Sequence, residues 1–399
     1  MKQYKLIILG ASNAQLPIIH KALELGYYVI TVDNVPDNIG HQFSHEFVNC
    51  STADHEGVLK FAQILKINGI VTFASDIATT TVAFVAKALN LTGCSLDVAK
   101  ILSNKANFRS FQQAHNLSHP GFFISKKASD IDCIPPQLTP PLIFKPIDTS
   151  GSRGITKVEA LDLNHYRYAF CHAQQYSRSK TVSIEQFIIG TDVSGDGFLI
   201  DGILHAFITQ KYQDNFIPTG HSFPDHMNPA YKQRIFDAIE SACHAVGYLN
   251  GPIDFDVNIS DAHVIIIEMS PRLGGNGIPE LIRYHTGIDL IAMTIEYALN
   301  KPIKKPTSLP VTRPCGSYVF GSEQAGKIDY IASSQEIFQK IPELFSCQLN
   351  YVVGDAIPAF EHSGNSLGYA LFACSSEDNY VQIVQRLQSA LQLRITTQP

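Results

Sequence analysis

Two carboxylates in the second half of the chain constrain its fold most strongly. Asp256 and Glu268 each lie at the end of a short apolar run, and the turn-forming stretch Asn258–Ala262 separates the runs. This pattern predicts an antiparallel hairpin that brings the two acids to one place on a sheet. Two carboxylates with Ser270 close by suit Mg²⁺, and Arg272 is a planar cation suited to a carboxylate or phosphate. The stretch therefore predicts a nucleotide–metal site, and a solvated hairpin with exposed charges is the alternative.

A loop of small residues provides a second, independent motif. An expected strand, Leu142–Lys145, ends in Lys145 and leads into this loop. Backbone N–H groups in such a loop can approach phosphate oxygens, and a lysine adds a positive charge. The P-loop order of residues is absent, and a simple hairpin connection is the alternative. We assign four residues of the loop to nucleotide binding: Ser150, Gly151, Ser152 and Gly154.

The segment Ser183–Asp192 forms a third motif. Its acid, Glu185, precedes an apolar stretch that ends in a glycine turn. A hinge of this kind can offer backbone groups to the edge of an adenine and an acid to ribose hydroxyls.

In this order and spacing, the three motifs resemble the ATP-grasp superfamily of carboxylate–amine ligases, and L-amino acid ligase-like members in particular. The resemblance extends over residues 1–300, and a softer one continues into the C-terminal segments. Each motif alone is unspecific, and the combination is specific. The residues that carry it are Lys105 in the pair Asn104-Lys105, Lys145 in FKP, the small-residue loop, Glu185 in EQF, Asp192, Asp256 and the stretch EMSPRLGG that begins at Glu268.

The resemblance implies ATP and Mg²⁺, or Mn²⁺, as cofactors. Lys105 and Lys145 would bind the phosphates, and the small-residue loop would close over them. Asp256 and Glu268 would hold the metal. Ser270 takes the position of a third ligand that is often Asn in the family, and a hydroxyl is a weaker ligand than an amide oxygen. The adenine hinge would consist of Glu185, Gln186, Phe187 and Ile188, with Asp192 at the ribose.

The resemblance also implies the reaction. ATP would phosphorylate a carboxylate to an acyl phosphate, and an amine, with an amino acid as one of the two substrates, would displace the phosphate. Arg272 would hold the carboxylate and the acyl phosphate, and a structural salt bridge is its alternative role. Related ligases carry an arrangement similar to Lys211 followed by Gly220-His221-Ser222-Phe223-Pro224. Lys211 would contact the transferred phosphate, and His221 would face the amine.

The first hundred residues predict a parallel α/β unit. The apolar strands Lys5–Leu9 and Tyr28–Val32 flank a helical pattern over Leu16–Leu25. The loop after the first strand, GASNAQ, lacks the later glycines of a dinucleotide fingerprint, which argues against NAD binding. Asp76 follows another buried strand, Gly69–Phe73, and is either a substrate contact or the N-cap of the next helix.

The fold class that we expect is α/β and α+β. A Rossmann-like parallel domain, residues 1–103, precedes an ATP-grasp domain, residues 104–305, whose core is an antiparallel sheet and whose lid covers about residues 115–190. A proline-rich linker over Pro302–Pro314 then leads into a small α+β module, residues 306–399.

Composition narrows the range of partners. A formal charge of −6 without basic blocks argues against a nucleic-acid surface. No apolar run approaches the roughly 20 residues that a membrane-spanning helix needs, and no signal peptide is apparent. The eight cysteines form no C-x-x-C pair, which suits a reducing cytoplasm. We therefore expect a cytoplasmic enzyme of small-molecule carboxylate and amine substrates, with a homodimer as a possible assembly.

Two other functions remain open. One is a bicarbonate-activating enzyme of the carboxylase or carbamoyl-phosphate-synthase type. The other is a catalytically inactive nucleotide-binding sensor, favoured by Ser270 at the third metal position. The presence of Lys105, Lys145, Asp256 and Glu268 argues against a sensor, which has little need for metal ligands.

Overall fold

The computed structural model describes residues 3–306 and 312–397 of the chain. It begins with a parallel sheet in the order β3–β2–β1–β4. The expected βαβ unit is confirmed, because β1 (Lys5–Leu9) and β2 (Tyr28–Asp33) pair in parallel and α1 (Leu16–Glu24) connects them. The other elements of this part are β3 (Glu46–Asn49), α2 (His55–Leu65), β4 (Gly69–Thr72), α3 (Thr79–Ala88) and α4 (Leu96–Leu102).

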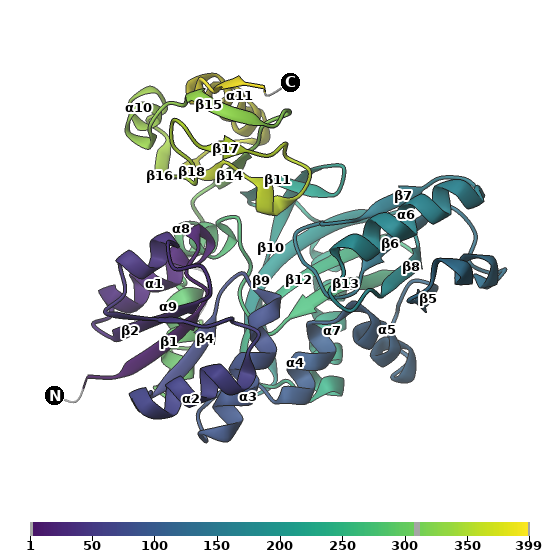
Figure 1. The fold of residues 1–399 in the computed structure, drawn as a ribbon, viewed down its shortest axis with the longest axis horizontal. Coiled ribbons are helices and arrows are strands. Elements are labelled where there is room, and N and C mark those ends of the chain that lie inside the picture. Colours follow the sequence, from purple (N-terminus) through teal and green to yellow (C-terminus); the bar gives the residue numbers. More distant parts are fainter. Residues whose placement is uncertain (1–2, 307–311, 398–399) are drawn as a thin grey trace.

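The region expected to be the lid contains a second sheet, in the order β5–β8–β6–β7. The helix α5 (Lys105–Ala114) precedes this sheet, and the side chain of Asn104 caps it by accepting the Asn107 N–H at 3.1 Å. Figure 1 shows the lid elements extending away from the N-terminal sheet. They are β5 (Phe122–Ser125), β6 (Leu142–Pro146), β7 (Thr156–Val158), α6 (Leu163–Tyr176) and β8 (Val182–Gln186).

An antiparallel sheet of eight strands, in the order β13–β12–β9–β10–β11–β14–β18–β16, runs through the centre of the molecule. The predicted fold class is confirmed by this layout. Its first five strands are β9 (Thr191–Ile200), β10 (Ile203–Asp214), β11 (Ile217–Phe223), β12 (Gly251–Ile259) and β13 (Val264–Ser270). The helices in the same region are α7 (Pro229–Val246), α8 (Ile278–Thr286) and α9 (Leu290–Ala298).

The C-terminal part has the expected α+β composition, but three of its strands continue the large sheet. The junction is the pairing of β11 with β14 (Cys315–Phe320). Residues 307–311 of the expected linker lie outside the described residues. The remaining elements are β15 (Gly326–Tyr330), α10 (Ser334–Lys340), β16 (Leu344–Leu349), β17 (Ala356–Ile357), β18 (Gly368–Ala373), α11 (Glu377–Leu391) and β19 (Arg394–Thr396).

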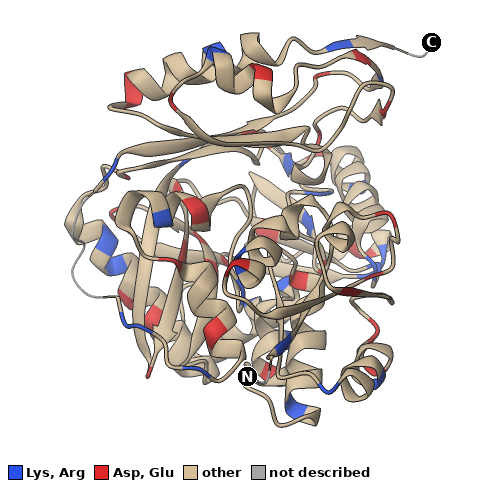
Figure 2. Cartoon of the chain, turned by 90° about the vertical axis from the view of Figure 1, so that its left-hand side faces the viewer, with Lys and Arg blue, Asp and Glu red and all other residues tan. Residues whose placement is uncertain are grey.

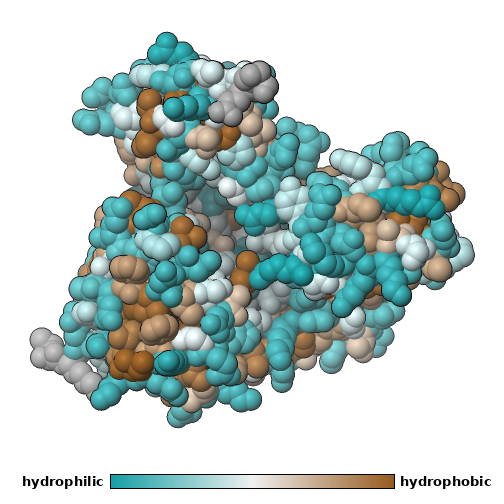
Figure 3. All heavy atoms as spheres, in the orientation of Figure 1, coloured by the Kyte–Doolittle hydropathy of each residue, from teal (hydrophilic) through white to brown (hydrophobic). Residues whose placement is uncertain are grey.

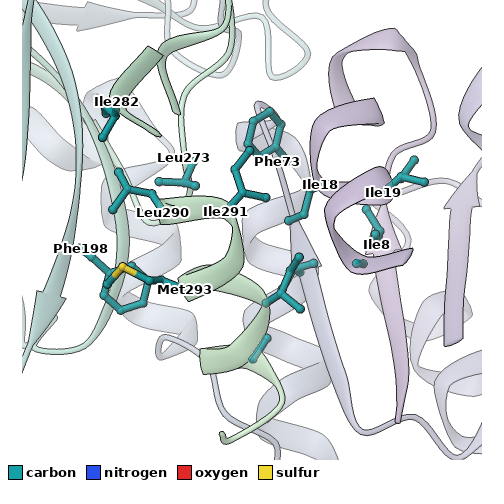
Figure 4. Close-up of a cluster of buried hydrophobic side chains, with 14 of the residues drawn as sticks. Ile8, Ile18, Ile19, Phe73, Phe198, Leu273, Ile282, Leu290, Ile291 and Met293 are labelled. Atoms are coloured by element: carbon teal, nitrogen blue, oxygen red, sulfur yellow. The ribbon is translucent and has the colours of Figure 1, made fainter. Parts of the chain in front are cut away.

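A shared apolar core fixes the N-terminal sheet against the large sheet. Ile18 of α1 and Phe73 pack in one cluster with Ile291 of α9 and Phe198 of β9 (Figure 4). The burial of such side chains gives each about 1.5–3 kcal/mol of favourable transfer free energy. This shared core therefore fixes the position of the N-terminal sheet relative to the large sheet.

The described residues contain no helix that is both long and apolar enough to cross a membrane. Acidic and basic residues are interspersed over the ribbon in Figure 2 and form no continuous basic face in that view.

Candidate active site

A cavity of about 780 Å³ lies where the N-terminal sheet, the lid, the large sheet and the C-terminal part meet. Figure 3 shows a hollow between these parts. Its volume falls in the range of about 300–1,000 Å³ that is typical of small-molecule sites. The site residues predicted from the sequence line this cavity, with three exceptions: Asp76, Gly154 and Ser270.

The predicted hairpin of β12 and β13 is confirmed, and its register places Asp256 directly opposite Glu268. Each carboxylate pairs with a lysine from another element. Asp256 Oδ1 lies 3.1 Å from Lys211 Nζ of β10, and Glu268 Oε2 lies 2.8 Å from Lys105 Nζ of α5. Burial alone would raise the pKa of Asp256, but Lys211 and the Ser194 hydroxyl hold it below its ordinary value. The acid is therefore ionised at neutral pH.

Lys145, the penultimate residue of the lid strand β6, belongs to a buried ion cluster that the sequence does not reveal. Its Nζ lies 3.0 Å from Glu185 Oε2, and Arg109 Nε of α5 lies 3.1 Å from Glu185 Oε1. Arg109 also donates to backbone carbonyls of β13, including that of Ile267 at 2.8 Å. Burial would raise the pKa of Glu185, but the two cations hold it well below its ordinary value. Glu185 thus anchors Lys145 at the cavity wall.

The small-residue loop lines the cavity through Ser150, Gly151 and Ser152. Gly154 does not line the cavity, but its backbone conformation determines the path of the loop. Its φ is +67°, and a Cβ atom there would lie 2.8 Å from Cδ2 of Tyr176. The loop also contacts the C-terminal part, because the Ser363 N–H donates to the Gly151 carbonyl at 3.0 Å.

The segment after Glu185 also reaches the cavity, as the hinge prediction requires. Gln186, Phe187 and Ile188 line it, together with Asp192 at the start of β9. Asp192 accepts hydrogen bonds from the side-chain amides of Asn258, at 2.7 Å, and Gln213, at 3.1 Å.

Arg272 lies between two carboxylates that the sequence did not connect with it. Its Nε donates to Asp76 Oδ1 at 2.8 Å, and its Nη1 bonds to Asp254. Ser270 donates its hydroxyl to the same Asp76 oxygen at 2.7 Å. The helix-cap alternative for Asp76 is therefore wrong, because its side chain faces Arg272 and Ala78 is the N-cap residue of α3. Burial raises the pKa of Asp254 to about 7, although Arg272 opposes the shift.

Lys211 and His221 are opposite each other in the β10–β11 register, and both line the cavity. The His221 ring is 1% exposed, and its Nδ1 lies 3.0 Å from the Thr209 hydroxyl. Burial and the neighbouring Lys211 lower the pKa of His221 to about 3. The imidazole is therefore neutral at neutral pH.

Site residues that the sequence analysis missed come from distant segments. Asp254 precedes the hairpin acid by two residues, and its spacing could have drawn attention to it. Arg109 lies on α5, but its partner is 76 residues away. Other missed cavity residues come from the N-terminal loops, from α8 and from the C-terminal part; they include Ser12, Gln15, Glu280, Gln348, Asn350 and Tyr369.

Comparisons with known proteins identify related domains and chains. A family model described as the ATP-grasp domain matches residues 138–280. The chain is 24% identical over 329 residues to the protein y4rH of Sinorhizobium fredii, covering 82% of this chain and 68% of that protein. It is 21% identical over 343 residues to human carnosine synthase 1. This alignment covers 77% of the present chain but only 41% of the synthase.

Solved structures share the fold over nearly the whole chain. The L-amino acid ligase from Bacillus licheniformis superposes with a TM-score of 0.83 at 22% identity, with 100% of each chain covered. The biotin carboxylase from Campylobacter jejuni superposes with a TM-score of 0.75 at 14% identity, over 99% of this chain and 93% of that one. At these identities the likeness concerns the fold and leaves the substrates open.

Proposed function

The chain belongs to the ATP-grasp superfamily, and we propose that it is an ATP-dependent carboxylate–amine ligase. It would form an amide bond through an acyl phosphate and release ADP and phosphate. The observation that carries this proposal is the pairing of Asp256 with Lys211 and of Glu268 with Lys105 on one wall of the cavity. Carboxylates that would bind a metal ion therefore lie next to lysines that would bind phosphate groups.

The two acids fit a magnesium ion that is shared with ATP. Asp256 and Glu268 would hold it, and no group of three or more His, Cys, Asp or Glu residues within 3–306 and 312–397 forms a fuller cage. Mg²⁺ commonly takes one or two carboxylates and fills its remaining positions with water and phosphate oxygens. When bound, it would neutralise negative charge on the phosphates. We do not assign Ser270 to the metal, because its hydroxyl binds Asp76.

The remaining nucleotide contacts follow from the cavity walls. Lys105 and Lys145 would bind phosphate oxygens, and Ser150, Gly151 and Ser152 would cover them from the lid. The backbone of residues 186–188 would meet the adenine, and Asp192 would meet the ribose. Fixed cations in an enclosed site stabilise transferred phosphoryl charge without reorganising during the reaction.

The chemical steps need no nucleophilic side chain. An oxygen of the substrate carboxylate attacks the γ-phosphorus of ATP, and ADP leaves. The amine nitrogen then attacks the carbonyl carbon, phosphate leaves, and the nitrogen loses a proton. Arg272 would hold the acyl phosphate, and Lys211 would contact the transferred phosphoryl group. His221, which is neutral at neutral pH, would face the amine.

The function is tested by phosphate release from Mg·ATP, screened against pooled amino acids and small carboxylic acids. Product masses are read in parallel, and bicarbonate forms a separate arm. We expect release that depends on a specific acid–amine pair, with a product lighter than the sum of the pair by one water. Release with bicarbonate alone would instead identify the carboxylase-type alternative. ATP binding without release in any arm would favour the sensor.

Replacing Glu268→Gln should lower Mg·ATP turnover by at least about 100-fold, because a metal-binding carboxylate is lost. The free energy of unfolding should change by less than about 1 kcal/mol, because the lost ion pair with Lys105 is only partly buried. The matched control is Glu323→Gln, an exposed glutamate outside the cavity. A Glu268→Gln protein with normal turnover would refute the metal assignment.

A further inference from the structure

The acids that line the cavity differ in how their charge is compensated. Glu185, Glu268, Asp256 and Asp254 each form an ion pair with a lysine or arginine. Asp33 and Asp192 each accept two hydrogen bonds from backbone or side-chain N–H groups. Glu280 of α8 has neither arrangement, which sets it apart from the other acids of the wall.

Glu280 has a single donor among the described residues. The Tyr369 hydroxyl of β18 donates to Glu280 Oε1 at 3.0 Å. Glu280 Oε2 is buried, and no donor of the described chain reaches it. An ionised carboxylate can accept about four hydrogen bonds, and a buried one without enough donors is costly. Glu280 therefore lines the cavity without a charged partner among the described residues.

The surroundings of Glu280 suit the second charge of an amino acid. Glu280 lies eight residues after Arg272, and both line the cavity. Figure 1 places α8 beside the N-terminal sheet and the C-terminal part, opposite the lid.

We propose that Glu280, positioned by Tyr369, binds the ammonium group of an amino-acid substrate of this cavity. The inference rests on the proposed function in that Arg272 would hold the carboxylate of the same reaction. An ammonium group has three N–H donors and a full positive charge, which matches an under-satisfied carboxylate. Burial raises the pKa of the Glu280 carboxyl group, and a bound cation would favour the ionised form of this group.

The substrate test compares each free amino acid with its N-acetyl derivative as the carboxylate substrate in the ATP-dependent assay, with the amine substrate supplied separately. Free amino acids should be turned over, and their N-acetyl derivatives, which lack the positive charge, should not. Equal turnover of both forms would overturn the inference.

The residue test uses Glu280→Gln, with Glu323→Gln as the matched control. We expect the KM for the amino acid to rise about 10- to 100-fold in Glu280→Gln, the loss expected for a charge-assisted hydrogen bond. The KM for ATP should stay within about 2-fold, because the proposed nucleotide contacts are made by other residues. Tyr369→Phe should raise the same amino-acid KM by a smaller factor. A role of Glu280 that is only structural would instead lower the unfolding temperature and leave the amino-acid KM unchanged, which would overturn the inference.

A binding assay separates this inference from the proposed function. The unfolding temperature is measured with free amino acids in the presence of Mg·ADP, for the wild type and Glu280→Gln. If ATP is never turned over, the ligase proposal fails, yet stabilisation by free amino acids that is lost in Glu280→Gln would still support the ammonium site. If no free amino acid stabilises the wild type or supports its turnover, the ammonium site is overturned.

Discussion

At the scale of single residues, the buried His221 couples the site to pH. Its pKa is lowered to about 3 in the folded protein, against about 6.5 in an unfolded chain. Between these values the unfolded chain binds a proton that the folded protein excludes. The contribution of His221 to stability is therefore complete above about pH 6.5 and is lost as the pH falls, by up to about 1.4 kcal/mol per pH unit.

We expect His221→Gln to remove this dependence. Between pH 7 and pH 5, the wild type should lose about 2 kcal/mol more of its unfolding free energy than the variant. Urea denaturation at several pH values measures the difference. Asp254, with a pKa of about 7, is present in both proteins, and its contribution largely cancels in the comparison. His165→Gln, at an exposed position, should leave the wild-type slope unchanged. Equal slopes for wild type and His221→Gln would mean that the imidazole is not held neutral.

At the scale of elements, Gly154 shapes the loop that would cover the phosphates. In Gly154→Ala, the left-handed φ of +67° would cost about 1–2 kcal/mol, and the new methyl group would press on Tyr176. Displacement of the loop should weaken the binding of Mg·ADP by about 10-fold or more, because small shifts of positioning groups are costly. Calorimetric titration measures the affinity.

Gly26→Ala is the matched control for the loop. Gly26 has a similar φ of +79°, has no heavy atom within 4 Å of a new Cβ, and does not line the cavity. This variant should lose a similar unfolding free energy and keep the affinity for Mg·ADP. If Gly154→Ala binds Mg·ADP as the wild type does, the shape of the loop does not govern nucleotide binding.

The elements that could be predicted from the sequence are those whose signals are local. The apolar run Lys5–Leu9 and the turn between β12 and β13 each lie within a few residues of chain, and the structure confirms both. Arg109 could not be predicted, because a buried arginine reads as a surface residue of an amphipathic helix until Glu185 is brought against it. Glu280 was missed for the same reason, since Tyr369 is 89 residues away.

At the scale of the whole molecule, the least predictable feature is the continuation of one sheet across the expected domain boundary. The pairing of β14 with β11 spans about a hundred residues of chain and leaves no local signal. Composition instead suggested a linker and a separate module. The structure places Cys315 and Leu371 in the same core cluster as Phe223 and Leu281, so the C-terminal part shares the core of the ATP-grasp region.

This shared core predicts the outcome of truncation. A chain ending after residue 305 would leave β11 as an unpaired edge and expose apolar residues, including Phe223 and Leu281, which favours aggregation. We expect it to be largely insoluble or aggregated in size-exclusion chromatography. A control chain ending after Leu393 lacks β19, which pairs with β15 in the small three-stranded sheet, and should remain soluble and bind Mg·ADP. A soluble 1–305 chain with cooperative unfolding would show instead that the C-terminal part is an independent module, as the sequence alone suggested.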